Sequence, residues 1–212
     1  MIAGLDVAIR RDAVWVRSAE PLRTLASAVV GGGLGAARHI LNMHVPKGYH
    51  GPRPDDDLTA FADTLGIREP FVGLMTAAWT HEARAVTEAA DGVAVTVVAT
   101  VGLGVPVAAG VSAPVAWRPS TINVIAVLDA RVEPAAAVNG VITVTEAKAG
   151  ALVEAGVVTE EGWPATGTVT DAVVVAWTGR GPALPYLGPA APGGWLLARA
   201  VRRAVREGLS GP

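Results

Sequence analysis

The sequence predicts a layered fold of the α/β or α+β class, with a central, mostly buried β-sheet flanked by helices. Runs of β-branched and apolar residues typical of strands recur along the chain, and segments with helical spacing lie between and after them. The chain has 212 residues, 51% of them hydrophobic, which is enough for one sizeable core. Since no internal repeat or linker interrupts this pattern, we expect residues 1–212 to form a single domain.

The first expected element is a β-hairpin. Two apolar runs, LDVAIR at 5–10 and AVWVRS at 13–18, lie on either side of Arg11 and Asp12. The next segment, LRTLASAVV at 22–30, fits either a strand or a short buried helix, because so short an apolar run does not distinguish the two.

Helices and strands are expected to alternate in the middle of the chain. Residues 55–65 begin with three aspartates and space their apolar residues as a helix does. Residues 71–75 predict a short apolar strand, and we expect residues 80–90 to be helical. Residues 93–101 (VAVTVVATV) are rich in β-branched residues and predict a buried strand.

The carboxyl-terminal half is expected to supply two more central strands and a last helix. The strands are TINVIAVLDA at 121–130 and DAVVVAW at 171–177. Proline and glycine dominate residues 179–194, which predicts a long loop that is a candidate lid. Residues 195–209 form an amphipathic helix whose four arginines are expected to face solvent.

Composition limits the function classes. The formal net charge is −2, so no large positive field attracts a phosphate backbone and we expect no nucleic-acid partner. Cysteine is absent, which excludes disulfides and thiol catalysis. The amino terminus lacks the form of a secretory signal, so we expect a cytoplasmic protein. The sequence leaves the oligomeric state open and is compatible with a homo-oligomer.

Residues 92–117 test the expectation that no segment crosses a membrane. This stretch contains no charged residue and is long enough to span a bilayer. Pro106, Pro114 and several glycines would interrupt a helix there. A buried strand followed by a turn-rich loop is therefore the favoured interpretation.

Residues 31–51 combine glycines, three histidines, an asparagine and a lysine, which indicates a functional site. Gly31, Gly33 and Ala36 fit a loose dinucleotide fingerprint with Asp55 about 20 residues on, although Asp55 begins an expected helix instead of ending a second strand. A tight turn is the alternative. The spacing of the histidines matches no standard zinc motif, so we expect no metal site.

The segment from 135 to 156 has two interpretations. As a helix it places Asn139, Thr143 and Glu146 along one stripe. As a hairpin it would turn at Asn139-Gly140, but the alanine-rich tail from Glu146 onward favours a helix.

Alternating threonines precede Asp171, at the start of an expected strand. The alternation places Thr166, Thr168 and Thr170 on one side of an extended chain. Their hydroxyls could bind a polar ligand or act as nucleophiles beside a base, whereas the structural alternative is that they stabilise a turn or a sheet edge.

Five segments, in this order, resemble the adenosylcobinamide amidohydrolases (the CbiZ family). They are HILNMHVPKGYHG at 39–51, VGLMTAA at 72–78, TIN at 121–123, VNGVITVTEAKAGAL at 138–152 and GTVTDAVVVA at 167–176. The resemblance extends over residues 22–206. It implies hydrolysis of the amide that joins the aminopropanol arm to the corrin ring of adenosylcobinamide, which releases adenosylcobyric acid for cobalamin salvage. The corrinoid is then the substrate, and no separate cofactor is expected.

Amide hydrolysis requires an activated water or hydroxyl, an oxyanion stabiliser and a proton for the departing amine. The catalytic candidates are Glu146 as base, Lys148 and His44 as sources of charge or protons, Thr168 as nucleophile, and Asp171. Thr170 is a second candidate nucleophile, and His50 a further proton source. The candidates for substrate binding are Asn42, Lys47, His50, Thr76, Asn123, Asn139 and Thr143.

Two other classes of function are compatible with the same residues. A corrinoid-binding or carrier protein would use the same asparagine, threonine and histidine contacts without proton transfer. A nucleotide-binding enzyme would use the glycine cluster at 31–35.

Overall fold

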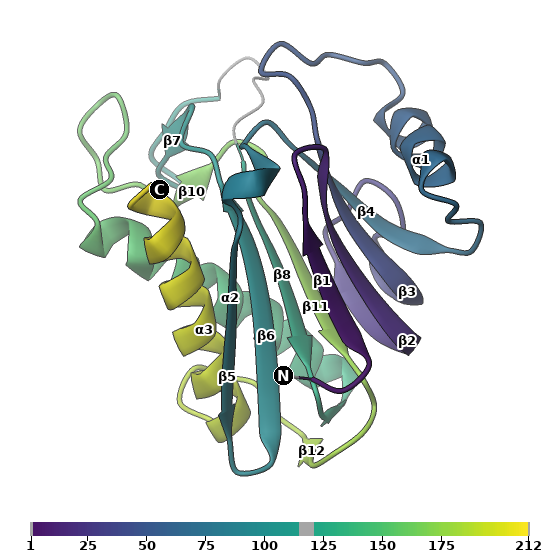
Figure 1. Cartoon of the computed structure of the whole chain (residues 1–212). Helices are drawn as coiled ribbons and strands as arrows, with labels where there is room; N and C mark the ends of the chain where they lie inside the picture. Colours follow the sequence, from purple (N-terminus) through teal and green to yellow (C-terminus); the bar gives the residue numbers. More distant parts are fainter. Residues whose placement is uncertain (1, 115–120, 212) are drawn as a thin grey trace.

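The computed structural model describes residues 2–114 and 121–211 (Figure 1). Within these residues the main sheet has eight strands, seven of them in the order β4-β3-β2-β11-β8-β6-β5, while β1 pairs with β2 outside this path. Strands and helices both contribute to this mixed sheet fold, so the predicted class of a central sheet flanked by helices is confirmed.

The main strands are β1 (Leu5–Ile9), β2 (Ala13–Ala26), β3 (Gly33–His44), β4 (Phe71–Thr76), β5 (Arg84–Ala90), β6 (Val93–Val101), β8 (Ile122–Leu128) and β11 (Ala172–Trp177). Four two-residue strands are β7 (Pro106–Val107), β9 (Arg131–Val132), β10 (Gly167–Thr168) and β12 (Ala183–Leu184). The helices are α1 (Pro54–Thr64), α2 (Pro134–Glu154), α3 (Pro192–Leu209) and the short 3₁₀-helix η1 (Thr80–Glu82).

The opening hairpin is confirmed, and β2 continues beyond it. The first half of β2 pairs with β1, and residues Arg23–Ala26 pair with β11 instead. The segment at 22–30 therefore begins as a strand, and its alternative as a buried helix is wrong. The register between β2 and β3 shifts between Arg17 and Leu22, which marks an irregularity of the β-bulge kind, called the bulge below. A bulge bends its strand and increases the local twist.

The bend folds one half of the sheet over the other. A hydrophobic cluster joins Val14 and Val16 of β2 to Val98 of β6 and to Ile125 and Val127 of β8. These strands are not neighbours of the first half of β2 in the sheet, so the cluster must lie between two facing layers. The fold thereby brings the ends of β3 and β4 close to β6 and β8, which matters for the site described below.

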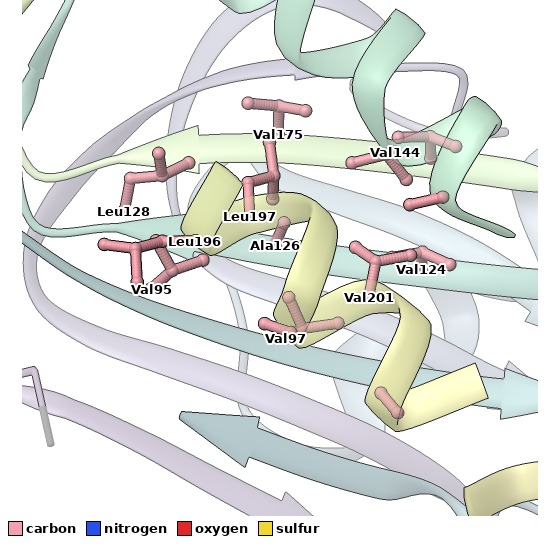
Figure 2. Packing of buried hydrophobic residues seen from close by; sticks show 14 of the residues in the cluster. Val95, Val97, Val124, Ala126, Leu128, Val144, Val175, Leu196, Leu197 and Val201 are labelled. Carbon is pink, nitrogen blue, oxygen red and sulfur yellow. The ribbon is translucent and has the colours of Figure 1, made fainter. Parts of the chain in front are cut away.

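Helices α2 and α3 cover the face of the sheet formed by β11, β8, β6 and β5 (Figure 1). Leu196, Leu197 and Val201 of α3 pack on Val95 and other valines of this face (Figure 2). The helix predicted at 195–209 is thus confirmed. Its arginines are exposed and form ion pairs with Glu88, Glu154 and Glu207.

The ambiguous segment from 135 to 156 is the helix α2, and the hairpin interpretation is wrong. Pro134 stands at its amino-terminal end, where its missing N–H group costs nothing. Gly140 does not turn the chain, because it is buried in the helix and a Cβ there would lie 3.3 Å from Leu187 and 3.4 Å from Val175. Close packing between helix and sheet therefore explains this glycine.

The prediction of a helix at 80–90 is wrong. Only η1 is helical there, and the rest is the edge strand β5, which pairs with β6 along its whole length. Asp91 and Gly92 connect the two strands with φ values of 53° and 77°, as a tight hairpin turn requires. Burial of Val86 in the main core and pairing with β6 outweigh the helical propensity of alanine and glutamate.

The charge-free segment from 92 to 117 begins as the buried strand β6 and continues into turns and β7, as predicted up to residue 114. Residues 115–117 lie outside the described residues. Among the helices that the structure describes, none combines the length and apolar character needed to cross a membrane.

The loop at 179–194 is largely irregular as predicted, although its last residues already belong to α3. It follows the end of β11 at Trp177, whereas the polar cluster described below lies at the start of that strand. The loop packs against α2, since Thr143 donates a hydrogen bond to the carbonyl of Leu187. Its position does not support the expected lid over that cluster.

Candidate functional site

Most of the predicted site residues meet where the two halves of the folded sheet face each other. Strand β6 ends where β8 and β11 begin, as their pairing requires. Strands β3 and β4 end together, and the folding of the sheet brings their ends to the same region, where Asn123 of β8 bonds to Asn42 and to the carbonyl of Met75. Chain reversals at the ends of strands expose side chains and backbone groups that regular pairing does not use. Segments far apart in the sequence therefore contribute polar groups to one region.

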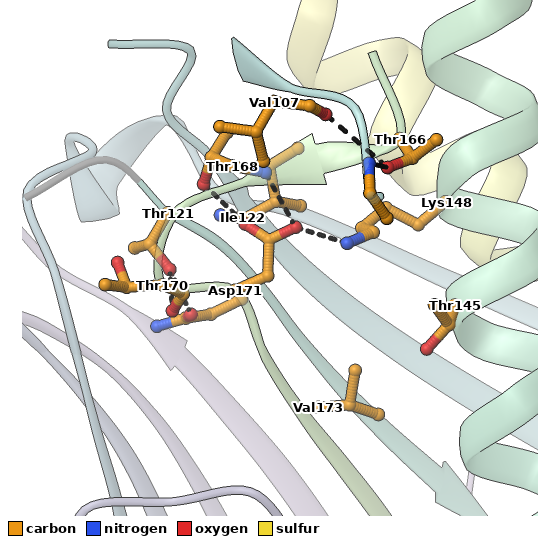
Figure 3. A network of polar contacts seen from close by, with 12 residues as sticks. Val107, Thr121, Ile122, Thr145, Lys148, Thr166, Thr168, Thr170, Asp171 and Val173 are labelled. Carbon is orange, nitrogen blue, oxygen red and sulfur yellow. Dashed lines mark hydrogen bonds and ion pairs between the residues drawn. The ribbon is translucent and has the colours of Figure 1, made fainter. Parts of the chain in front are cut away.

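Asp171 is the centre of a polar cluster at the start of β11 (Figure 3). Its Oδ1 accepts hydrogen bonds from the Thr168 hydroxyl at 2.5 Å and from the backbone N–H of Ile122 at 2.9 Å. Its Oδ2 accepts from the backbone N–H of Thr168 at 3.1 Å and forms an ion pair with the Lys148 ammonium group. Only 7% of the Lys148 side chain and 11% of the Asp171 side chain are exposed. Both charged groups have therefore lost most of their contacts with water, and the ion pair between them compensates for part of that loss.

Gly167 makes this ion pair possible. A Cβ at this position would lie 2.4 Å from Oδ2 of Asp171 and 2.7 Å from Nζ of Lys148. Any other residue at 167 would force the carboxylate and the ammonium group to move. The sequence GTVTD thus folds into a turn in which Thr168 and Asp171 bond to each other and Gly167 leaves room for the lysine of α2.

A second group of buried polar residues lies where the two halves of the folded sheet meet. The Asn42 amide donates to the Thr100 hydroxyl at 2.9 Å and accepts from the Asn123 amide at 2.9 Å. Asn123 also donates to the carbonyl of Met75 at 2.8 Å. Since Asn42 and Asn123 are 2% and 1% exposed, their hydrogen bonds within the protein replace those to water.

Thr121 connects the two polar groups. Its hydroxyl lies 2.8 Å from both the side-chain oxygen of Asn123 and the carbonyl of Thr170. The asparagine pair and the lysine–aspartate pair are therefore parts of one hydrogen-bonded system at the start of β8 and β11.

A cavity of about 420 Å³ opens beside this polar system. Its lining residues are Ser27, Val29, Val45, Tyr49, His50, Gly51, Pro54, Leu74, Met75, Thr76, Ala77, Thr121, Thr170, Asp171 and Ala172. Most of these are apolar, while Thr121, Thr170 and Asp171 bring the polar system to the wall. Cavities of this size and composition are typical of small-molecule sites.

His50 lies at the exposed part of the cavity wall. Its Nδ1 is 2.7 Å from the carbonyl oxygen of Gly48. Because a carbonyl oxygen only accepts, Nδ1 carries the proton, and Nε2 holds the lone pair in the neutral ring. This histidine is equipped to accept a proton from a group in the cavity.

Tyr49, beside His50, ties the cavity wall to α1. Its hydroxyl donates to the Asp57 carboxylate at 2.6 Å. Burial, followed by the hydrogen bond and the negative charge of Asp57, raises the pKa of Tyr49 to about 12. The tyrosine is therefore neutral at physiological pH and acts as a hydrogen-bond donor.

His44 and Lys47 lie by a neighbouring cavity of about 350 Å³. The ring of His44 bonds through Nδ1 to the carbonyl of Ala78 at 2.9 Å and stacks on Trp79. Lys47, Ala77, Ala78, Trp79, Glu82, Val101, Gly102, Leu103 and Gly104 line this second cavity. Ala77 lines both cavities, so the two are adjacent.

Three of the predicted site residues do not reach this region. Glu146 is exposed on α2, only two positions from Lys148, and residues two apart on a helix do not share a face. Thr143 is buried against the loop at 179–194, through its bond to Leu187. Asn139 lies one turn further toward the amino terminus of α2, away from Lys148. The stripe of Asn139, Thr143 and Glu146 therefore does not form part of the cavity wall.

The structure also decides between the interpretations of the glycine cluster. Gly31 and Gly33 have φ values of 67° and 83° and lead directly into strand β3. A dinucleotide fingerprint requires a helix at this point, so that interpretation is wrong and the tight turn is confirmed. Asp55 lies in the first turn of α1, where bonding to the exposed Arg53 lowers its pKa.

The histidines of the same segment point to different surroundings. His39 accepts from the Trp15 indole at 3.2 Å and bonds to Glu69 at 3.1 Å, outside both cavities. Across residues 2–114 and 121–211, no three side chains of His, Cys, Asp or Glu are grouped so that they could hold a metal ion.

Thr121, Thr100 and Tyr49 were not among the residues predicted for the site. Tyr49 and Thr121 lie in segments that carry the family resemblance, and this position was the one feature of the sequence that could have identified them as site residues. Thr100 is part of a run of β-branched residues and carries no local signal at all. Only the facing layers of the sheet show that its hydroxyl meets Asn42.

The family model and the curated relatives that match this chain all carry the same family name. A family model described as adenosylcobinamide amidohydrolase matches residues 1–211. The adenosylcobinamide amidohydrolase of Methanosarcina mazei is 30% identical over 194 residues, which cover 86% of this chain and 88% of that protein. The protein of the same name from Halobacterium salinarum is 39% identical over 122 residues, or 54% of this chain and 50% of that protein.

A solved structure shares the fold. The crystal structure of the PH0078 protein from Pyrococcus horikoshii OT3 superposes with a TM-score of 0.53 and covers 99% of this chain and 80% of that one. Its sequence identity is 13%, so the likeness concerns the fold alone.

Proposed function

The chain belongs to the adenosylcobinamide amidohydrolase family, and from this premise we propose that it hydrolyses adenosylcobinamide. The bond cleaved is the amide between the aminopropanol arm and the corrin ring. The products are adenosylcobyric acid and aminopropanol, and the reaction serves corrinoid salvage. The corrinoid is the substrate in this proposal, and no separate cofactor is involved.

One observation carries the proposal beyond the family name. The cavity of about 420 Å³ is bordered on one side by the polar system around Asp171 and on another by His50. An amide placed between them would meet both a proton acceptor and fixed polar groups, which amide hydrolysis requires.

We assign the general base to His50 in place of Glu146. Nε2 of His50 takes a proton from water as the water oxygen attacks the amide carbon. The tetrahedral intermediate then breaks its C–N bond, and the imidazolium returns the proton to the departing nitrogen. One water is consumed, the carbonyl carbon becomes a carboxylic acid, and the histidine is regenerated as the free base.

The polar system around Asp171 positions the substrate instead of transferring protons. Its carboxylate already accepts from four donor groups, so its oxygens are largely committed. Thr121 and Thr170 lie at the cavity wall, and Thr76 is held by its bond from the N–H of Ala78. Lys148 compensates the buried charge of Asp171 and keeps this wall in place.

The Thr168 hydroxyl remains a second candidate nucleophile because it already donates to a carboxylate. In that pathway the Thr168 oxygen attacks the amide carbon, the C–N bond breaks with release of aminopropanol, and an ester joins Thr168 to the corrinoid acid. Water then hydrolyses the ester, which releases adenosylcobyric acid and restores the hydroxyl. Thr168→Val removes the hydroxyl at nearly constant shape. Retained turnover in this variant supports attack by water, whereas loss of turnover with a detectable covalent adduct in the wild type would support the threonine.

The proposed activity is tested directly with the purified protein. Incubation with adenosylcobinamide, followed by mass spectrometry, should yield adenosylcobyric acid and aminopropanol, with boiled protein as control. Tight binding without products would instead identify a non-catalytic corrinoid-binding protein. Prior dialysis against a chelator should leave the rate unchanged if no metal takes part.

A further inference from the structure

The second cavity has an aromatic wall that the hydrolytic step does not use. The indole of Trp79 is 54% exposed, although its size and apolarity favour burial. The His44 ring stacks on it with a centroid distance of 4.7 Å and an interplanar angle of 23°. His44 is held in turn by its bond to the carbonyl of Ala78.

This arrangement presents an ordered flat surface. Trp79 directly precedes η1, whose hydrogen bonds include those from Glu82 to Trp79 and from Ala83 to Thr80. The Thr80 hydroxyl is anchored to the carbonyls of Arg10 and Arg11 at 2.8 and 2.9 Å. These bonds hold the backbone at Trp79, and the rings of His44 and His81, at centroid distances of 4.7 and 5.7 Å, restrict the indole itself. The indole therefore loses little conformational freedom when a planar ligand stacks on it.

The charges around Trp79 balance. Lys47 and Glu82 both line the cavity and bring one charge of each sign. The two charges do not generate a field that selects a phosphate, but they offer a donor and an acceptor to hydroxyl and ring nitrogen groups. The chemistry therefore fits an uncharged planar heterocycle that carries hydroxyl groups, which is a nucleoside.

We propose that the second cavity binds the adenosyl group of the substrate, with the adenine ring on the indole of Trp79. This inference rests on the proposed function. Since Ala77 lines both cavities, one large molecule can occupy them together, with its amide arm beside His50 and its nucleoside on Trp79. Trp79 then selects corrinoids that carry an adenosyl group.

The test compares Trp79→Ala with the wild type on two corrinoids. Stacking of a base on an aromatic side chain is worth about 1–3 kcal/mol, so kcat/KM for adenosylcobinamide should fall by about 5- to 150-fold, mainly through KM. Cyanocobinamide lacks the nucleoside, and its inhibition constant as a competitor should not change. Trp79→Phe should restore most of the loss.

A control and a turnover-free measurement complete the test. Trp195→Ala removes a different half-exposed tryptophan, which lies on α3. This variant should change neither kcat/KM for adenosylcobinamide nor the inhibition constant of cyanocobinamide. Calorimetry with 5′-deoxyadenosine should detect binding to the wild type that Trp79→Ala abolishes, and this result does not depend on hydrolysis. The inference would be overturned if Trp79→Ala weakened the binding of adenosylcobinamide and cyanocobinamide equally, or if it left the binding of 5′-deoxyadenosine unchanged. Either result would count against it even if the protein is an active hydrolase.

Discussion

Asp171 shows at the scale of single residues how a buried charge is accommodated. Its four donors come from β8, from the turn at 167–171 and from α2. Each donor offsets part of the cost of removing the carboxylate from water. The arrangement depends on the missing side chain of Gly167, because the backbone of this residue passes directly beside the ion pair.

Gly167→Ala is predicted to destabilise the protein by about 3 kcal/mol, because the new methyl group would separate Lys148 from Asp171. Urea unfolding monitored by circular dichroism measures the change. Gly48→Ala is the matched control, because a Cβ there meets nothing within 4 Å, and its effect should stay within about 0.5 kcal/mol. Equal stability of the two variants would contradict the account of the cluster.

His50→Ala is predicted to lower kcat by about 10²- to 10⁴-fold, the usual contribution of a general base. KM should change little, and the fold should be intact because the side chain is exposed. The measurement is the initial rate of aminopropanol release. His39→Ala, which alters a histidine outside both cavities, is the control; a similar fall in both variants would remove His50 from this role.

At the scale of elements, α1 is attached to the cavity wall by the bond between Tyr49 and Asp57. The helix packs against β3 and β4 through Leu58 and Ala62, which are almost fully buried. The hydrogen bond from Tyr49 therefore ties the segment that carries His50 to an element with its own core. Because the protonated tyrosine is the donor, this connection depends on pH.

The pH dependence has a definite sign. The pKa of Tyr49 is raised from 10.0 to about 12, so the stabilisation is complete below pH 10 and is lost as the pH rises toward 12. The melting temperature of the wild type should exceed that of Tyr49→Phe by a constant amount from neutral pH to pH 10. This difference should then disappear between pH 10 and 12; a difference that persists above pH 12 would contradict the assignment.

At the scale of the whole molecule, the fold of the sheet onto itself brings the site together. Asn42 of β3 and Asn123 of β8 are separated in the sheet by β2 and β11, yet their amides bond directly. The bulge in β2 bends the sheet and makes this contact possible. The two halves are then held by the hydrophobic cluster between them and by this buried amide pair.

A double-mutant cycle tests this connection. Asn42→Leu and Asn123→Leu should each destabilise the protein by about 1–3 kcal/mol, because each leaves the remaining amide short of a partner in the interior. The double variant should cost clearly less than the sum, since it removes both amides. Urea unfolding provides the free energies, and Asn139→Leu on α2 serves as the control. Additive costs would show that the two amides stabilise the protein independently.

Much of the secondary structure could be predicted from local pattern. The opening hairpin, the strands at 71–75, 93–101, 121–130 and 171–177, and the helices at 55–65 and 195–209 all lie where expected. Apolar spacing along the chain reports directly which face will be buried. The segment at 80–90 is the exception, because its strand exists only through pairing with β6 and burial of Val86.

The site was less predictable than the fold. The segments that resemble the family contain Asn42, Asn123, Lys148 and Asp171, and the structure places all four in one polar system. The same segments contain Asn139 and Glu146, which lie elsewhere on α2. Helical spacing defined their stripe correctly, but it carries no information on which stripe faces the cavity.

The sequence by itself determined the fold class, most of the elements and the family, because these follow from local spacing and from the order of short segments. Only the tertiary structure decided which polar groups meet. The bulge of β2 sets how the two halves of the sheet face each other, and Gly167 sets how closely Lys148 approaches Asp171. Both depend on contacts between residues distant in the chain, which no local pattern records.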